Sequence, residues 1–200
     1  MSRKCAAMIE PADHKANRQT SEPALSAEPE PESPALSIDI DCRHADWRGL
    51  EEAVRAQALF VWRYLDLPAA EISLVLADST FIATLNETYR DKTGVTNVLS
   101  FAAQDFIAPV SAAALTAVPM PRLLGDIVLA YDVLMAEAAA QGKNPTDHMY
   151  HLLTHGLLHL LGHDHIEEAD AQLMEQLEKD ILMAQGRPDP YAASHEESRR

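Results

Sequence analysis

The feature that most constrains this chain is a run of histidines near its C-terminal end. Six of the nine histidines lie between positions 148 and 165, and residues 155 to 165 read His-Gly-Leu-Leu-His-Leu-Leu-Gly-His-Asp-His. Residues four apart on an α-helix stand one above the other, so His155 and His159 would present two imidazoles to one point. Gly162 would end that helix by adopting a positive φ, and the returning chain would bring His165 to the same point. The chain is therefore expected to fold around a helix with a metal site at its end.

Imidazole donors indicate which metal this site would hold. Three neutral histidine nitrogens with one open position form the ligand set of a catalytic zinc site. We predict one zinc ion per chain, bound by His155, His159 and His165; nickel or copper could occupy the same imidazoles in vitro. A structural zinc is disfavoured, because closed sites use four protein ligands and are rich in cysteine. His148 and His151, on the same helix face, are interpreted as core or surface residues, with a place beside the ligands as the alternative.

The same histidine spacing occurs in metzincin metalloproteases. Their second motif position is a glutamate that acts as general base, and here that position is Gly156. Peptide hydrolysis would then lack an obvious proton acceptor. A metalloprotease-like hydrolase is kept only as a minor alternative.

Hydrophobic periodicity predicts the secondary structure around this segment. The pattern favours an α+β fold: a single domain in which a small mixed β-sheet is covered by helices, with the metal site at the end of a central helix. Asp46 and Asp78 are expected to cap two helices, and Leu173, Leu177 and Ile181 to form the packed stripe of the last helix. The expected strands are 37–42, 71–77, 97–101 and 124–130; the expected helices are 46–65, 78 to near 94, 132–141, 145–161 and 166–184, with 102–121 a loop.

The ends of the chain differ from its middle. Residues 1–37 are rich in proline and glutamate and are expected to form a disordered tail, and 186–200 a flexible C-terminal tail, around a domain at 38–185. No run of 18 apolar residues occurs, and the first residues lack the apolar stretch of an export signal. Cys5 and Cys42 fit no ligand or redox spacing and are interpreted as reduced thiols. These features predict a cytoplasmic protein with no membrane partner.

Net charge limits the ways in which the chain could bind nucleic acid. Its 31 acidic residues against 16 basic ones give a formal charge of −15. Phosphate binding depends on lysine and arginine, so a broad basic face for DNA or RNA is excluded. A phosphate-bearing substrate would have to be held locally, by a metal ion and one or two arginines.

Four motifs in the chain match those of one family. They are the histidine segment at 155–165, Leu85-Asn-Glu-Thr-Tyr-Arg90, Thr96-Asn-Val-Leu-Ser-Phe101 and Leu124-Gly-Asp-Ile-Val128. The last three are similar to the family patterns L-N-x-x-[YF]-R, T-D-V-L-S-F and L-G-D-I. Over about residues 38–185 the chain resembles the YbeY family of bacterial rRNA maturation endoribonucleases.

This resemblance implies a function. It implies a single-domain, metal-dependent endoribonuclease that cleaves single-stranded RNA, matures the 3′ end of small-subunit rRNA and takes part in ribosome quality control, with the ribosome or small-subunit proteins as partners. His155, His159 and His165 match the family's zinc ligands. Arg90 matches its functional arginine, which could hold a phosphate at two points; without the motif, a surface salt bridge would be the favoured interpretation. The alternative is a metal-stabilised ribosome-assembly or rRNA-binding factor with little catalysis of its own.

The chain departs from the family at two positions. Asn97 stands where the family usually has aspartate, which removes a charge. His163 stands where many relatives have tyrosine, and we expect it at the rim of the site or in a stacking position. Asp164 is interpreted either as a carboxylate that orients an imidazole or as a solvated turn residue. Ser100 is interpreted as an ordinary strand residue, with a position facing the cleft as the alternative.

Overall fold

The computed structural model describes residues 36–104, 109–116 and 122–192. The proposed N-terminal tail lies outside these residues, apart from its last two positions, which begin the first strand. The described elements are β1 (Leu36–Cys42), the 3-10 turn η1 (Ala45–Trp47), α1 (Glu51–Tyr64), β2 (Ala70–Ala77), α2 (Ser79–Arg90), β3 (Val98–Ala102), α3 (Ala112–Thr116), β4 (Arg122–Ala130), α4 (Tyr131–Ala140), α5 (Pro145–Leu160) and α6 (Glu168–Ala184).

The four strands form one mixed sheet in the order β1-β2-β4-β3. β2 pairs in parallel with β1 and with β4, whereas β3 runs antiparallel to β4. Ile72, Leu74 and Leu76 alternate along β2 and are buried in one core cluster, because every second side chain of a strand points to the same face of the sheet. The mixed sheet predicted from the sequence is thereby confirmed.

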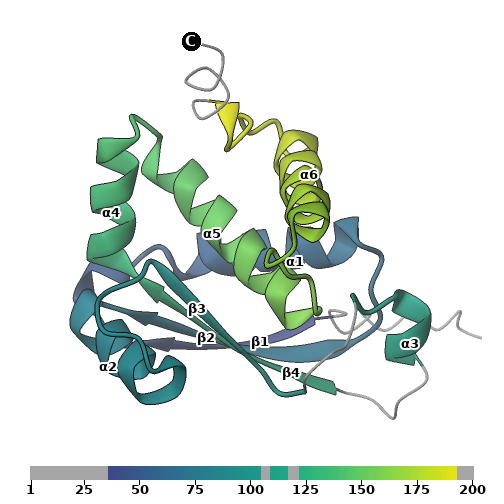
Figure 1. Ribbon diagram of the computed structural model, residues 1–200, viewed down its shortest axis with the longest axis horizontal. Coiled ribbons are helices and arrows are strands. Elements are labelled where there is room, and N and C mark those ends of the chain that lie inside the picture. The colour runs from purple at the N-terminus through teal and green to yellow at the C-terminus, as the bar shows by residue number, and fades with distance from the viewer. Residues whose placement is uncertain (1–35, 105–108, 117–121, 193–200) are drawn as a thin grey trace, which may run out of the picture. The chain divides into compact units, whose positions relative to one another are not determined.

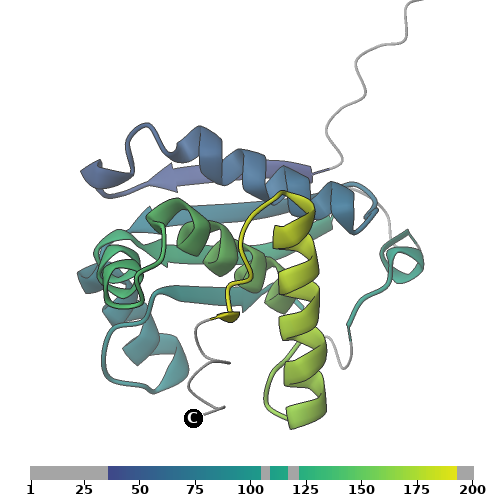
Figure 2. The ribbon, with the colours of Figure 1, turned by 90° about the horizontal axis from the view of Figure 1, so that it is seen from above.

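Helices cover both faces of this sheet (Figures 1 and 2). On one face, α2 packs through Ile82 against Leu99 of β3 and Val128 of β4. On the other face lie α1, α4 and α5, and α6 packs against α5 as an outer layer. The α+β class and the central position of the histidine-bearing helix are both confirmed.

Local sequence signals explain the ends of α5. Asn144 caps its N-terminus, because its side-chain oxygen accepts hydrogen bonds from the backbone N–H groups of Thr146 and Asp147, and Pro145 occupies the first turn. At the other end Gly162 adopts a φ of 83° and turns the chain back. The structure thus confirms the predicted helix and its end at Gly162.

One predicted helix start is wrong. Asp46 does not cap α1, which begins at Glu51; it lies in the short turn η1 instead. The reason is Trp47, which is fully buried and donates its indole N–H to the carbonyl of Ala77 at 2.8 Å. That burial bends the chain before the helix can start. Asp78, in contrast, caps α2 as predicted.

The segment predicted as a loop also differs from expectation. It contains the short helix α3, whose Leu115 is buried, and β4 starts two residues earlier than expected. Residues 105–108 and 117–121 of this segment lie outside the described residues. None of the described helices has both the length and the apolar character needed to span a bilayer.

The chain beyond α6 is held against the helices as far as Tyr191. Arg187 forms an ion pair with Asp147 of α5 at 2.9 Å, and Lys179 of α6 pairs with Asp189 at 2.6 Å. The domain limits at 38 and 185 stay predictions. Cys42 is a free, exposed thiol, and Cys5 lies outside the described residues.

Candidate metal centre

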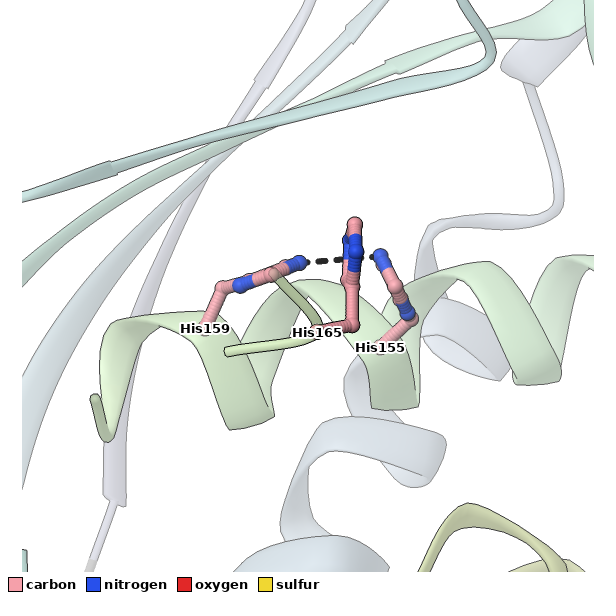
Figure 3. Close-up of side chains that lie close together, drawn as sticks. All are labelled: His155, His159 and His165. Atoms are coloured by element: carbon pink, nitrogen blue, oxygen red, sulfur yellow. Dashed lines mark hydrogen bonds between the residues drawn. The ribbon is translucent and has the colours of Figure 1, made fainter. Parts of the chain in front are cut away.

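Three histidines converge at the C-terminal end of α5 (Figure 3). His155 and His159 lie one helical turn apart, and His165 returns to them after Gly162. The nearest nitrogens of the three rings all lie within 4.8 Å of one another, and the Nε2 atoms of His155 and His159 are 3.0 Å apart. The structure thus brings together the three residues that the sequence pattern predicts as metal ligands.

Hydrogen bonds on the far side of two rings determine where their protons lie. The Nδ1 atom of His155 is 2.8 Å from a carboxylate oxygen of Glu178, and Nδ1 of His159 is 3.0 Å from the backbone carbonyl of His163. A carboxylate and a carbonyl can only accept, so both Nδ1 atoms carry the proton. The two Nε2 atoms then face each other across 3.0 Å. A proton or a metal ion between them makes this contact favourable, because each Nε2 can offer it a lone pair.

The protonation state and spacing of these rings suit a metal ion. Burial, together with the neighbouring His155 and His165, lowers the pKa of His159 to about 4, so this ring is neutral near pH 7. Tetrahedral zinc with Zn–N bonds of about 2.0–2.1 Å needs nitrogens about 3.3 Å apart. The observed separations, from 3.0 Å to at most 4.8 Å, bracket that value. The donor set is therefore compatible with zinc.

A buried carboxylate stands behind the site. Glu178 of α6 is fully buried, and its second oxygen accepts hydrogen bonds from Nε2 of His151, at 2.8 Å, and from the hydroxyl of Tyr191. Burial opposes ionisation, yet the hydrogen bonds from His151 and His155 outweigh it and lower the pKa of Glu178 to about 2. The group is thus an anion near pH 7.

Sequence reasoning did not identify Glu178 or Tyr191 as site residues. One signal was available for the first: Glu178 lies on the same helical stripe as Met174, Ile181 and Leu182, and those are the residues that α6 buries. A charge on a buried stripe needs partners. The expected stripe of Leu173, Leu177 and Ile181 is wrong in part, because Leu173 is 68% exposed.

Arg90 lies at the end of α2, beside the edge strand β3. Its guanidinium donates to the backbone carbonyl of Ser100 at 2.8 Å, and the Ser100 hydroxyl donates to the carbonyl of Gly156 at 3.1 Å. Gly156 directly follows His155 in α5. Ser100 therefore links the arginine to the helix that carries the cluster, and its role is more than that of an ordinary strand residue.

Gly156 has a packing reason to be glycine. A Cβ atom there would lie 2.9 Å from Cγ2 of Ile127 and 3.1 Å from the Ser100 hydroxyl. This position of α5 faces the sheet. The Cβ atom of a glutamate at 156 would clash with Ile127 of β4. The general base of the metzincin pattern therefore does not fit at this position.

Asn97 belongs to a second polar cluster. Its side-chain oxygen accepts the backbone N–H of Val98 at 2.7 Å, which directs its amide nitrogen to Glu137, also at 2.7 Å. The same oxygen of Glu137 lies 2.9 Å from Nε2 of the buried His148. An aspartate at position 97 would face that carboxylate, so the asparagine is the residue that fits beside Glu137.

His163 and Asp164 shape the turn after α5. His163 contributes its backbone carbonyl to His159, and its own ring is partly buried. One Asp164 oxygen accepts the backbone N–H groups of His165 and Ile166, the latter at 2.8 Å. Asp164 thus fixes the turn that delivers the third ligand, and its described contacts are with backbone and not with an imidazole.

Comparison with known proteins adds to this geometry. The family model described as Endoribonuclease YbeY matches residues 41–186. Proteins named Endoribonuclease YbeY are similar to this chain: the one from Parvibaculum lavamentivorans is 43% identical over 162 residues, covering 80% of this chain and 87% of the relative. That from Chelativorans is 41% identical over 172 residues, covering 82% and 99%. That from Paramagnetospirillum magneticum is 48% identical over 130 residues, covering 64% and 76%.

A solved structure was also matched. The solution structure of TM1509 from Thermotoga maritima superposes with a TM-score of 0.48 at 16% identity, covering 76% of this chain and 97% of that one.

Proposed function

The chain belongs to the YbeY endoribonuclease family, and from this premise we propose that it cleaves single-stranded RNA with one zinc ion held by His155, His159 and His165. Its relatives are named endoribonucleases, so an RNA-cleaving hydrolase is the activity that family membership supports. The finer proposal is that the substrate is the 3′ end of small-subunit rRNA, in the cytoplasm, during ribosome maturation and quality control.

One observation carries the metal-dependent part of this proposal. The Nε2 atoms of His155 and His159 face each other at 3.0 Å while both Nδ1 protons are committed to other acceptors. A metal ion between them would be bound by both Nε2 lone pairs. Three histidine ligands leave one position open for substrate or water, as catalytic zinc sites do.

The chain's own residues give the site a mechanism. When bound, the zinc ion would supply Lewis acidity toward a phosphate oxygen and would lower the pKa of water, so that hydroxide is available as the nucleophile near neutral pH. Arg90 would hold a non-bridging phosphate oxygen and stabilise the charge that develops as the phosphodiester is attacked. Its bond to the Ser100 carbonyl uses one arm of the guanidinium, which leaves other N–H groups to donate to phosphate.

The acidic charge of the protein indicates how RNA would be bound. With a formal charge of −15, the chain lacks the excess of basic residues that binds nucleic acid over a wide area. RNA contact would be confined to the metal centre and Arg90. Binding to free RNA would be weak and salt-sensitive, and the ribosome or a small-subunit protein would supply the remaining contacts.

The test is cleavage of a single-stranded RNA that spans a small-subunit rRNA 3′ end. Wild type is compared with His159→Ala and Arg90→Ala, and with Arg63→Ala as matched control, because Arg63 is also exposed in the last turn of a helix. Zinc content and thermal unfolding are recorded for each. We expect cleavage by wild type and Arg63→Ala only, with Arg90→Ala folded and zinc-loaded.

The second candidate is a metal-supported ribosome-assembly factor with little catalysis, which the acidic charge favours. It becomes the better account if pure, zinc-loaded wild type leaves the RNA intact. Equal cleavage by Arg90→Ala and wild type would remove Arg90 from the mechanism while leaving the metal centre in place.

A further inference from the structure

Glu178 is a buried carboxylate that contacts the imidazole of a residue of the histidine cluster. One of its oxygens accepts from Nδ1 of His155 at 2.8 Å. The other accepts from Nε2 of His151 at 2.8 Å and from the Tyr191 hydroxyl. These contacts join α5, α6 and the segment after α6 at a single buried anion.

A buried charge at this position destabilises the fold unless hydrogen bonds or opposite charges compensate it. The Glu178 side chain is 1% exposed, and burying an ionised carboxylate destabilises the folded state before its partners are counted. Three hydrogen-bond donors compensate that cost. One of them, His155, offers its remaining nitrogen to the cluster, so the anion also acts on the lone pair that would bind metal.

The chemistry of carboxylate–histidine pairs indicates what this contact does. An imidazole that donates Nδ1–H to a carboxylate is fixed in one tautomer and one orientation, and its Nε2 becomes a stronger base. The negative charge of Glu178 also offsets part of the positive charge of a bound cation. Both effects favour metal binding at Nε2 of His155.

We propose that Glu178 is the positioning residue of the metal centre: it fixes the tautomer and orientation of His155 and thereby sets the affinity for zinc, while His151 and Tyr191 hold Glu178 in place. This inference deepens the proposed function, since it rests on the metal site proposed at His155, His159 and His165. It does not depend on RNA being the substrate.

The inference gives residues 187–192 a role in the site. Tyr191 follows α6 and reaches back to Glu178, and its ring centroid lies 5.2 Å from that of His151. The ion pairs Arg187–Asp147 and Lys179–Asp189 hold the same segment against α5 and α6. The C-terminal segment is thus part of the support of the metal centre.

The structure provides a matched control for the test. Glu137 of α4 accepts from Nε2 of His148 at 2.9 Å, so it is also a carboxylate bound to a histidine of α5. His148 is not one of the three clustered ligands. Removing the charge of Glu137 therefore perturbs a similar pair without touching the metal centre.

The experiment measures zinc binding by the full chain through competition with a chromophoric chelator. It also records the visible absorption spectrum of the cobalt-substituted protein, which reports ligand geometry. The variants are Glu178→Gln, Tyr191→Phe and the control Glu137→Gln, and urea unfolding of each metal-free protein reports stability. We expect Glu178→Gln to weaken zinc binding by about 10- to 100-fold and to shift the cobalt spectrum. Tyr191→Phe should change both in the same direction by less, and Glu137→Gln should change neither.

Two results would overturn the inference. If Glu178→Gln lowers the stability of the metal-free protein but keeps wild-type zinc affinity and cobalt spectrum, Glu178 serves only the fold. If wild type binds no zinc, the metal site fails, and this inference fails with it. Where Glu178→Gln does not fold, Tyr191→Phe decides by the same two readouts. Zinc-loaded wild type that leaves RNA intact would remove the ribonuclease proposal alone.

Discussion

Replacing Gly125 with alanine should break the sheet at the strand that supports the candidate site. Gly125 lies in β4 opposite Ala102 of β3, with a φ of 137°. A Cβ atom there would lie 2.1 Å from the backbone carbonyl oxygen of Phe101. A carbon atom normally approaches a carbonyl oxygen no closer than about 3.3 Å, so β3 would have to move by about 1 Å.

Two costs add up at this position. A non-glycine residue held at such a φ costs about 1–3 kcal/mol. The displaced backbone of β3 cannot relax as a side chain would, because it is hydrogen-bonded to β4, so we expect a total loss of about 3–5 kcal/mol. The displacement would also move Ser100, and with it the carbonyl that anchors Arg90.

Urea unfolding followed by circular dichroism measures this loss, and Gly142→Ala is the control. Gly142 has a φ of 64° after α4, but no atom lies within 4 Å of a Cβ built there. Only the conformational cost of about 1–2 kcal/mol then applies. A loss for Gly125→Ala no greater than that for Gly142→Ala would refute the close approach of β3 and β4 as the reason for this glycine.

Three further perturbations follow from the structure. Chelation of metal should lower the melting temperature by roughly 5–10 °C relative to protein in zinc at 100 times the dissociation constant; a similar response in His159→Ala would contradict the proposed ligand set. Asn97→Asp places a second carboxylate 2.7 Å from that of Glu137 and should cost about 2 kcal/mol at pH 7. That cost should shrink at acidic pH, because protonation of one carboxyl of the pair removes the repulsion, and a pH-independent cost would count against the repulsion. Burial opposes ionisation of Asp132, but hydrogen bonds from Ser79 outweigh it and lower its pKa from 3.8. The ionised Asp132 therefore stabilises the fold above pH 3.8, and this contribution is lost as the pH falls below that value. Asp132→Ala should lower the free energy of unfolding by about 1 kcal/mol at pH 7 and by progressively less below pH 3.8. An equal loss at pH 2 would contradict this.

Local features of the sequence determined much of the fold and the core of the site. His155 and His159 share a face because the helix repeats every 3.6 residues, and Gly162 turns the chain because glycine accepts a positive φ. Asp78 caps α2 for the same kind of local reason. Such signals involve residues within one or two turns of each other, so they can be read without knowing the fold.

Tertiary packing alone decided what surrounds the histidines. Glu178 reaches His155 from another helix, and Ser100 connects Arg90 to Gly156 across an edge strand. The apolar residues of α6 allow two stripes, one with Leu173 and one with Glu178, and the packing of the helix buries the second. The burial of Glu178 depends on its partners, which are His151 and His155 of α5 and Tyr191 after α6. Hydrogen bonds between distant segments need a specific docking of elements, and apolar spacing within one element does not encode it.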